Sequence, residues 1–180
     1  DYKKPFIVRI GGEFSGWWNG YEPYEYPKAY RKIVQMFRDA GVENAAFVWC
    51  YEPAAPDDFM EKNSAGDYKW FPGDDVIDWY SVDVFGNNDI SGPKTTANGT
   101  KTNYGKTIAF LELAKAHKKP VMIAESGSAF VDVTTSVEDG KADWEAWFVP
   151  YFKLMKDYPV IKWFHFVNYD WTKAGYYVIT

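Results

Sequence analysis

Residues 5–13 read PFIVRIGGE, and this stretch decides the fold. Residues 6–10 are apolar apart from Arg9, which is typical of a strand that is buried on both faces. Gly11 and Gly12 mark the end of the strand, and Glu13 follows at once. Residues 27–40 place apolar side chains at helical spacing, and Gly41 marks the stop of that helix. The stretch therefore predicts a strand followed by a helix.

Four further apolar runs continue the pattern. The predicted strands cover residues 44–49, 76–85, 120–124 and 160–167, and the predicted helices cover residues 104–117 and 142–156. Pro150 must kink or restart the second of these helices. Strands that are apolar throughout and alternate with helices or long crossovers indicate a parallel sheet covered on both faces. We find no linker or repeat, so residues 1–180 are expected to form one domain.

The composition of the 180 residues narrows the classes of function. An apolar content of 47% is typical of a globular protein, and no run has the roughly 20 apolar residues that a membrane span needs. A net charge of −5 gives no electrostatic reason to bind nucleic acid. No signal peptide is visible, Cys50 has no partner for a disulfide, and no motif for a metal or cofactor is present.

Two glutamates stand at the ends of predicted strands. Glu13 follows the first strand, and Glu125 follows the strand at residues 120–124. In parallel α/β folds the side chains that carry out chemistry gather at the carboxyl ends of the strands. Cleavage of a glycosidic bond needs one carboxylic acid to protonate the leaving oxygen and a second carboxylate to attack or to activate water. The pair therefore predicts a glycosidase, and the separation of the two groups decides between retention and inversion.

Several segments together resemble a known family. They are VRIGGEFSGWWNG, YPKAYRKIVQMFRDAGVENAAFVW, WFPGDDVIDWYSVDVFG, KPVMIAESGS and IKWFHFVNYDW. Their order and spacing resemble clan A glycoside hydrolases, in particular family 26, whose best-known members are β-mannanases. The resemblance implies a (β/α)8 barrel of which this chain holds strands four to eight, about five βα units. It also implies a secreted or cell-surface enzyme.

The same resemblance implies roles for the two glutamates. Glu13 takes the place of the general acid/base, and Glu125 takes that of the nucleophile in a retaining double displacement on a polysaccharide such as mannan or a related β-glucan. The chain departs from the pattern where Gly12 replaces a histidine and where Phe85 ends a strand that commonly carries a tyrosine. A non-catalytic carbohydrate-binding protein is therefore an alternative function.

The length raises a second alternative, because an eight-stranded barrel typically needs about 250 residues. The chain is then an inactive fragment of a longer enzyme, or a partial barrel whose open edges associate with the missing part or with a second copy.

The predicted substrate-binding residues are mostly aromatic, because aromatic rings stack on the apolar faces of sugars. They are Trp17, Trp18, Trp49, Trp171, Asn168 and Arg9. Arg9 lies in an apolar strand, where a charge must be paired, so we also expect it to form an ion pair with Glu125 or Asp83.

Overall fold

The computed structural model describes residues 3–128 and 136–167. The strands are β1 (Phe6–Glu13), β2 (Ala45–Tyr51), β3 (Trp79–Val82), β4 (Val121–Ile123) and β5 (Ile161–Phe164). The helices are η1 (Trp17–Asn19), α1 (Tyr26–Asp39), α2 (Asn87–Ile90), α3 (Asn103–Ala116), α4 (Val137–Asp143), the π-helical turn η2 (Trp144–Phe148) and α5 (Val149–Asp157). None of the helices in these ranges is long and apolar enough to cross a membrane.

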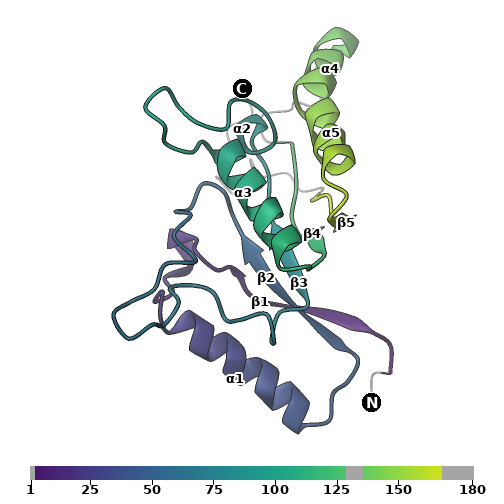
Figure 1. The fold of residues 1–180 in the computed structure, drawn as a ribbon. Coiled ribbons are helices and arrows are strands. Elements are labelled where there is room, and N and C mark those ends of the chain that lie inside the picture. The colour runs from purple at the N-terminus through teal and green to yellow at the C-terminus, as the bar shows by residue number, and fades with distance from the viewer. Residues whose placement is uncertain (1–2, 129–135, 168–180) are drawn as a thin grey trace.

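The five strands form one parallel sheet in the order β1-β2-β3-β4-β5, which confirms the predicted parallel arrangement (Figure 1). Each crossover places the next strand beside the previous one. A doubly wound sheet would instead reverse its strand order part-way. An unreversed order is how a (β/α) barrel is built, and it brings the carboxyl ends of all five strands to the same edge.

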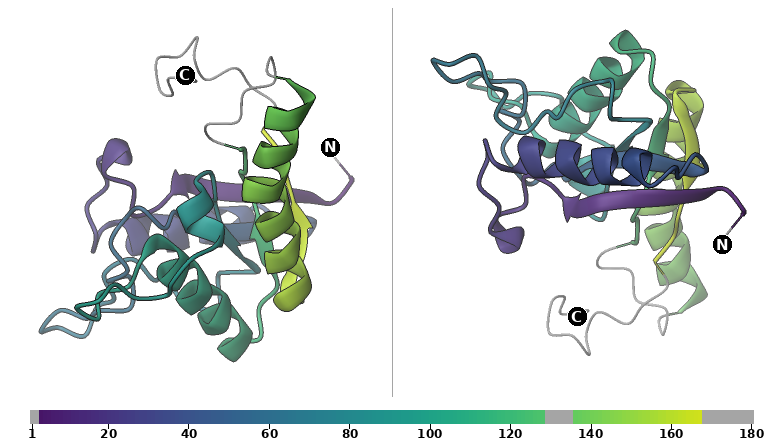
Figure 2. Two further views of the ribbon diagram at one scale, coloured as in Figure 1. Left: turned by 90° about the horizontal axis from the view of Figure 1, so that it is seen from above. Right: turned by 90° about the horizontal axis from the view of Figure 1, so that it is seen from below.

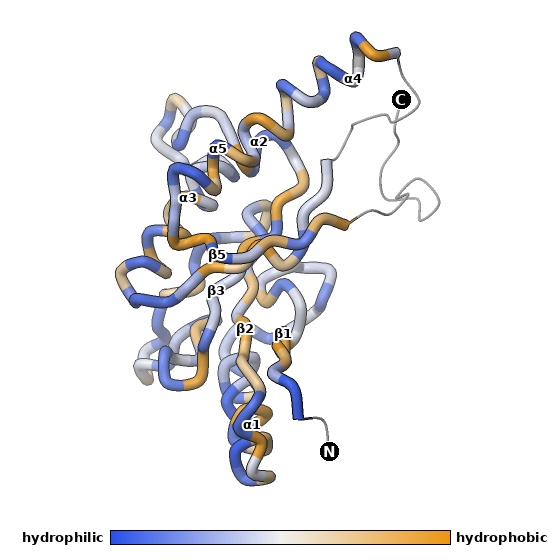
Figure 3. The backbone as a smooth tube through the Cα atoms, turned by 90° about the vertical axis from the view of Figure 1, so that its right-hand side faces the viewer, coloured by the Kyte–Doolittle hydropathy of each residue, from blue (hydrophilic) through white to orange (hydrophobic). Residues whose placement is uncertain are grey.

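The two faces of the sheet have different surroundings. On the outer face, alternate residues of β2 pack against helices: Phe47 contacts Phe37 of α1, and Trp49 and Tyr51 contact Phe110 of α3. Figure 2 shows the helices and the sheet from above and below. Figure 3 shows hydrophobic and hydrophilic residues alternating along α1, so only one side of that helix contributes to the core. The core is dense in rings: Trp49 stacks on Phe14 with ring centroids 4.4 Å apart.

The inner face carries Val48, Cys50 and Met122, and beside them lies an open groove of about 920 Å³. Trp163 in the lining of this groove is 46% exposed. The sequence led us to expect cover on both faces, but in the described ranges the helices cover only the outer one. In a complete barrel such an inner face is filled by side chains from all strands.

The ends of several elements differ from the prediction. β1 continues to Glu13, β3 is shorter than the predicted strand, and the last helical segment begins at Val137. Pro150 lies in the first turn of α5, where the missing N–H is not needed, and the preceding turn is the π-helical η2. Helical structure runs without a break from η2 into α5, and the change from π-helical to α-helical geometry occurs next to Pro150.

A bulge at Gly11 and Gly12 lets β1 reach the edge of the sheet. Their φ angles are 76° and 57°, in the left-handed region that side chains disfavour, and the pairing of β1 with β2 shifts between Arg9 and Glu13. A Cβ atom at Gly11 would lie 2.9 Å from the Tyr26 ring. The bulge therefore sets the position of Glu13 opposite Cys50.

We predict that Gly11→Ala lowers the free energy of unfolding by more than the roughly 1–2 kcal/mol that left-handed strain alone costs. Gly41→Ala is the matched control, since Gly41 has φ 71° and open space around it. Urea denaturation of both variants measures the difference. Equal losses would contradict a close contact with Tyr26.

Candidate active site

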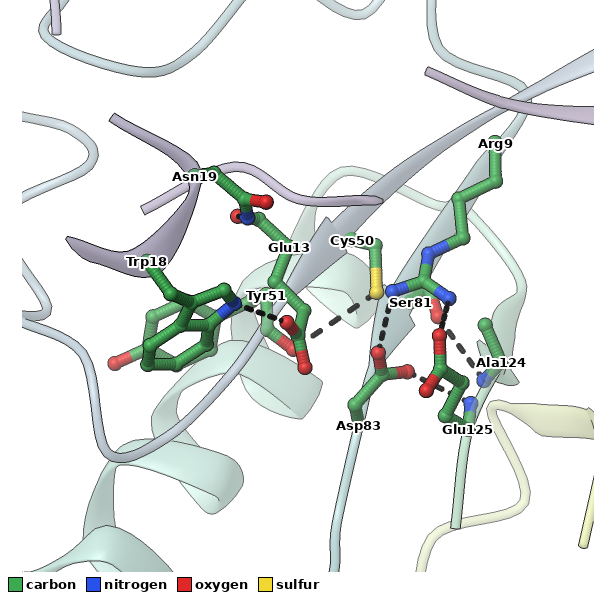
Figure 4. A network of polar contacts seen from close by, with 10 residues as sticks. All are labelled: Arg9, Glu13, Trp18, Asn19, Cys50, Tyr51, Ser81, Asp83, Ala124 and Glu125. Carbon is green, nitrogen blue, oxygen red and sulfur yellow. Dashed lines mark hydrogen bonds and ion pairs between the residues drawn. The ribbon is translucent and has the colours of Figure 1, made fainter. Parts of the chain in front are cut away.

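The carboxyl ends of β1, β3 and β4 bring four charged side chains together (Figure 4). Glu13 is the last residue of β1, and Arg9 lies one bulge earlier on the same strand. Asp83 follows β3, and Glu125 lies two residues beyond β4. The two glutamates that the sequence singled out thus lie in one polar network.

Arg9 is the centre of this network. Its Nη1 donates to Glu125 Oε1, and its Nη2 donates to Asp83 Oδ2 over 2.7 Å. The predicted ion pair is confirmed, and Arg9 forms it with both carboxylates. A charge on an apolar strand is costly unless it is paired in this way.

Asp83 also holds the backbone next to the predicted nucleophile. Its side chain is fully buried, and Oδ1 accepts the N–H of Glu125 over 2.8 Å. One residue earlier, the N–H of Ala124 donates to Ser81 Oγ over 3.2 Å. Glu125 is therefore fixed through both its carboxyl group and its main chain.

Glu13 has a different environment. Its Oε2 accepts a hydrogen bond of 2.7 Å from the indole Nε1 of Trp18, and its backbone oxygen accepts one of 2.7 Å from Asn19 Nδ2. Burial raises the pKa of Glu13, and the negative charge of Glu125 adds to this, while Trp18 and Arg9 oppose it. Glu13 thus holds its proton to a higher pH than an ordinary glutamate, which suits a general acid.

At Gly12 and Phe85, where the chain departs from the family pattern, other side chains contact the two glutamates. A histidine at position 12 would be strained, because Gly12 has φ 57°. The hydrogen bond to Glu13 comes from Trp18 in the following loop instead. Phe85 has no hydroxyl group to offer, and the hydrogen bonds of Glu125 described above are with Arg9 and Asp83.

The predicted substrate-binding residues other than Arg9 separate into three groups. Trp17 is 84% exposed and Trp18 is 44% exposed, and both lie on η1 beside Glu13. Trp49 is completely buried, stacked on Phe14, with Nε1 donating to the Trp70 carbonyl over 3.2 Å. It has no free ring face for a sugar, so its prediction as a substrate-binding residue is wrong. Asn168 and Trp171 lie outside the described residues.

Sequence reasoning missed Glu52, which directly follows β2. The side chain is buried, and its Oε2 accepts the N–H of Ala54 over 2.8 Å. The rule that identified Glu13 and Glu125, a glutamate at the end of a strand, applies here too. It failed because the strand was predicted to stop at residue 49, whereas β2 continues to Tyr51.

Across residues 3–128 and 136–167, no three His, Cys, Asp or Glu side chains are grouped as ligands for a metal ion. The polar groups described above are carboxyl groups, one guanidinium group and an indole N–H.

Comparison with known proteins places these observations in context. Residues 2–162 match the family model of glycosyl hydrolase family 26. The β-1,3-xylanase TXYA from a Vibrio species is 28% identical over 189 residues, which is 95% of this chain but 37% of that protein. The chain thus spans a little over a third of the length of this relative.

Solved structures show the same partial coverage. The catalytic domain of the endo-β-1,4-mannanase from Bacillus sp. JAMB-750 superposes with a TM-score of 0.60 at 24% identity, over 90% of this chain and 40% of that one. Bacillus subtilis mannanase BCman gives a TM-score of 0.61 at 17% identity, over 94% and 44%. The five-stranded sheet is a part of a (β/α)8 barrel, as the sequence predicted.

The contrasting environments of Glu13 and Glu125 predict opposite effects on stability. Because the folded state raises the pKa of Glu13, ionisation of Glu13 destabilises the fold as the pH rises above about 4.3, the pKa of an unfolded glutamate. Glu13→Gln should therefore increase the free energy of unfolding at pH 7, and the gain should shrink near pH 4. Glu125→Gln should lower it by about 1–3 kcal/mol, because Arg9 loses a charged partner.

Urea denaturation of the two variants and the wild type at both pH values measures these changes. A similar loss of stability in both variants at pH 7 would contradict the assignment.

Proposed function

This chain belongs to glycosyl hydrolase family 26, and on that premise we propose that it carries the catalytic pair of a retaining endo-β-glycosidase. The observation that carries the proposal is the contrast between the two strand-end glutamates. Glu125 faces a guanidinium group, whereas Glu13 faces an indole N–H and has a raised pKa. One group is thus prepared to attack and the other to give a proton.

In the proposed reaction, Glu13 first protonates the glycosidic oxygen while the Glu125 carboxylate attacks the anomeric carbon. The bond to the leaving sugar breaks, and a glycosyl ester forms on Glu125. Glu13, now ionised, then removes a proton from water, and the water oxygen displaces Glu125. Arg9 and Asp83 keep the Glu125 carboxyl group in place through both steps.

We propose a β-linked polysaccharide as the substrate. The names of the relatives give two candidates, since the Vibrio enzyme is a β-1,3-xylanase and the Bacillus JAMB-750 protein is an endo-β-1,4-mannanase. Mannan remains our leading candidate because of the motifs in the sequence, and β-1,3-xylan joins it because of the match over 95% of this chain. A polysaccharide such as mannan or β-1,3-xylan is degraded outside the cell, which supports secretion or display at the cell surface.

The open inner face bears on the form in which this enzyme acts. We propose that the groove of about 920 Å³ is filled by the remaining strands of a complete barrel, since the chain covers 40% of the JAMB-750 catalytic domain. Association of two copies through the edges β1 and β5 is the alternative.

A non-catalytic carbohydrate-binding protein is the second candidate function. The observation that favours it is the lack of a side chain at Gly12 and of a hydroxyl group at Phe85, the two positions where the family pattern places supporting groups. Such a protein would bind oligosaccharides through the same aromatic loop, without turnover.

We predict that Glu125→Gln and Glu13→Gln both reduce the turnover of an oligosaccharide by about 100-fold or more. With a glycoside whose leaving group needs no proton, Glu13→Gln should lose less turnover than Glu125→Gln, because formation of the glycosyl ester then requires the nucleophile but no proton from Glu13. Steady-state kinetics on both substrates, with the exposed Glu22 changed to Gln as control, measure the difference. Binding of oligosaccharides with no released reducing ends would favour the non-catalytic function.

We predict that Trp17→Ala weakens the binding of mannan or β-1,3-xylan oligosaccharides about 2- to 10-fold, the range expected for one aromatic stacking contact. Trp17 is 84% exposed and lies on η1 next to Trp18. Phe152→Ala is the control, since Phe152 is an exposed ring on α5. Isothermal titration calorimetry gives both affinities. Equal effects of the two substitutions would remove η1 from the binding surface.

A further inference from the structure

Ser126, the residue after Glu125, is held by a side chain from a helix. Ser126 is completely buried, and its Oγ lies 2.8 Å from the Tyr151 hydroxyl oxygen and 2.6 Å from the His165 carbonyl oxygen. A carbonyl oxygen can only accept, so Ser126 donates its single O–H to His165. Tyr151 must therefore donate its own O–H to Ser126. Two hydrogen bonds in a row thus run from α5 through Ser126 to the segment after β5.

A second side chain of the same helical segment holds the neighbouring strand end. Trp147 in η2 lies four residues before Tyr151 and stacks on it, with ring centroids 4.5 Å apart. Both rings are buried. The indole Nε1 of Trp147 donates to the Phe85 carbonyl over 2.8 Å. The segment after β3 and the segment after β4 are thus each tied to the helix by one hydrogen-bond donor.

The two tied segments also hold each other, and Glu125 lies where they meet. The N–H of Val84 donates to the Glu125 carbonyl over 3.1 Å, and Val84 pairs with Ser126 in a parallel bridge. Asp83 accepts the N–H of Glu125. The main chain on both sides of the Glu125 Cα atom is therefore fixed, whereas its side chain is 36% exposed beside Arg9 (Figure 4).

We propose that Tyr151 is a positioning residue, whose O–H acts through Ser126 to hold the Glu125 carboxylate at the right place for attack on the anomeric carbon. The proposal rests on the function proposed above, in which Glu125 is the nucleophile. A misplacement of about 1 Å can slow a reaction about 100-fold. Tyr151 is buried on the helical side of the sheet, so it influences the reaction through the main chain and not by contact with a sugar.

Packing alone does not require this hydroxyl group. Tyr30 is another fully buried tyrosine, and its hydroxyl oxygen has no hydrogen-bond partner among residues 3–128 and 136–167. The fold thus tolerates a buried tyrosine whose O–H is unpaired. A phenylalanine at position 151 would keep the ring that stacks on Trp147. What the tyrosine adds there is the hydrogen bond to Ser126.

The first test is Tyr151→Phe in the complete natural polypeptide that contains residues 1–180. Because the Glu125 segment then loses one support, formation of the glycosyl ester at saturating substrate should become about 10-fold slower. Tyr30→Phe is the matched control, since it removes a buried hydroxyl group that has no partner within the described ranges. It should leave this rate within about twofold of the wild type.

A 2-deoxy-2-fluoro glycoside with a good leaving group provides the readout, because it forms the ester on Glu125 and the ester then hydrolyses very slowly. Mass spectrometry counts the labelled chains over time at several concentrations of the glycoside. A displaced Glu125 should label every chain about 10-fold more slowly, with an unchanged affinity for the glycoside. A role of Tyr151 in folding alone would label fewer chains at the wild-type rate, and this result would overturn the proposal.

Ser126→Ala is the second variant, and it carries the test if Tyr151→Phe does not fold. It removes both hydrogen bonds of the Ser126 hydroxyl group, so labelling should be slowed at least as much as in Tyr151→Phe. Adding Tyr151→Phe to Ser126→Ala should cause no further loss, because the hydroxyl group of Tyr151 acts through Ser126. Labelling at the wild-type rate in Ser126→Ala, or losses that multiply in the double variant, would overturn the proposal.

Hydrogen exchange at the Glu125 amide separates this proposal from the proposed function, because it requires no turnover. The N–H groups of Glu125 and Phe47 each donate to an aspartate carboxylate over 2.8 Å, so Phe47 is an internal control. In Tyr151→Phe, exchange should become about 10-fold faster at Glu125 and stay the same at Phe47.

This exchange measurement has two decisive outcomes. Faster exchange at Glu125 in a protein that cleaves no β-glycan would refute the glycosidase but support the role of Tyr151 in holding Glu125. Unchanged exchange at Glu125 would refute that role whether or not the wild type is active.

Discussion

The ion-pair bridge from Arg9 to Asp83 and Glu125 is the interaction on which the site depends. The three residues come from β1, from the end of β3 and from the end of β4, so the bridge reaches from the first to the fourth strand of the sheet. A charged side chain in an apolar strand is costly without partners, and each carboxylate would be costly without Arg9. The three groups therefore stabilise one another, and the arrangement that satisfies them is also the one that fixes Glu125.

Glu13 reaches this network through packing and backbone geometry. Gly11 and Gly12 allow a bulge in β1, and Phe14 anchors the next residue in the ring-rich core against Trp49. Between the bulge and the anchor, Glu13 has little freedom left. Trp18 from η1 then orients the carboxyl group with a single hydrogen bond. A rigid core thus positions a side chain whose own contacts are few.

The sequence predicts the strands better than their ends. Apolar runs reveal buried strands because both faces of a parallel sheet are apolar, but the same property hides which side chain points where. For this reason the sequence predicts Trp49 as a rim residue although it points into the core, and it gives no sign that Glu52 lies at a strand end. The only sign of the β1 bulge in the sequence is the pair Gly11 and Gly12. Two adjacent glycines are equally typical of a strand end, so the sequence does not show that β1 continues to Glu13.

The sequence predicts a contact correctly where one residue by itself requires a partner. Arg9 had to be paired because it interrupts an apolar strand, and only carboxylates at neighbouring strand ends could reach it. By contrast, the hydrogen bond from Trp18 to Glu13 depends on the path of a loop, which composition does not specify. The same holds for the position of Phe85, whose carbonyl accepts the indole N–H of Trp147 from a helix 62 residues later.

The site has more carboxyl groups than cations. The described network sets the single guanidinium group of Arg9 against the carboxyl groups of Glu13, Glu52, Asp83 and Glu125. One cation cannot balance four anions at close range in a poorly solvated site, so some of these groups must keep their protons. Burial raises the pKa of Asp83 to about 8 and that of Glu52 to about 7, and it also raises the pKa of Glu13. Of the two carboxylates that Arg9 contacts, Asp83 is buried whereas the side chain of Glu125 is 36% exposed, so Glu125 is the one that can meet a substrate.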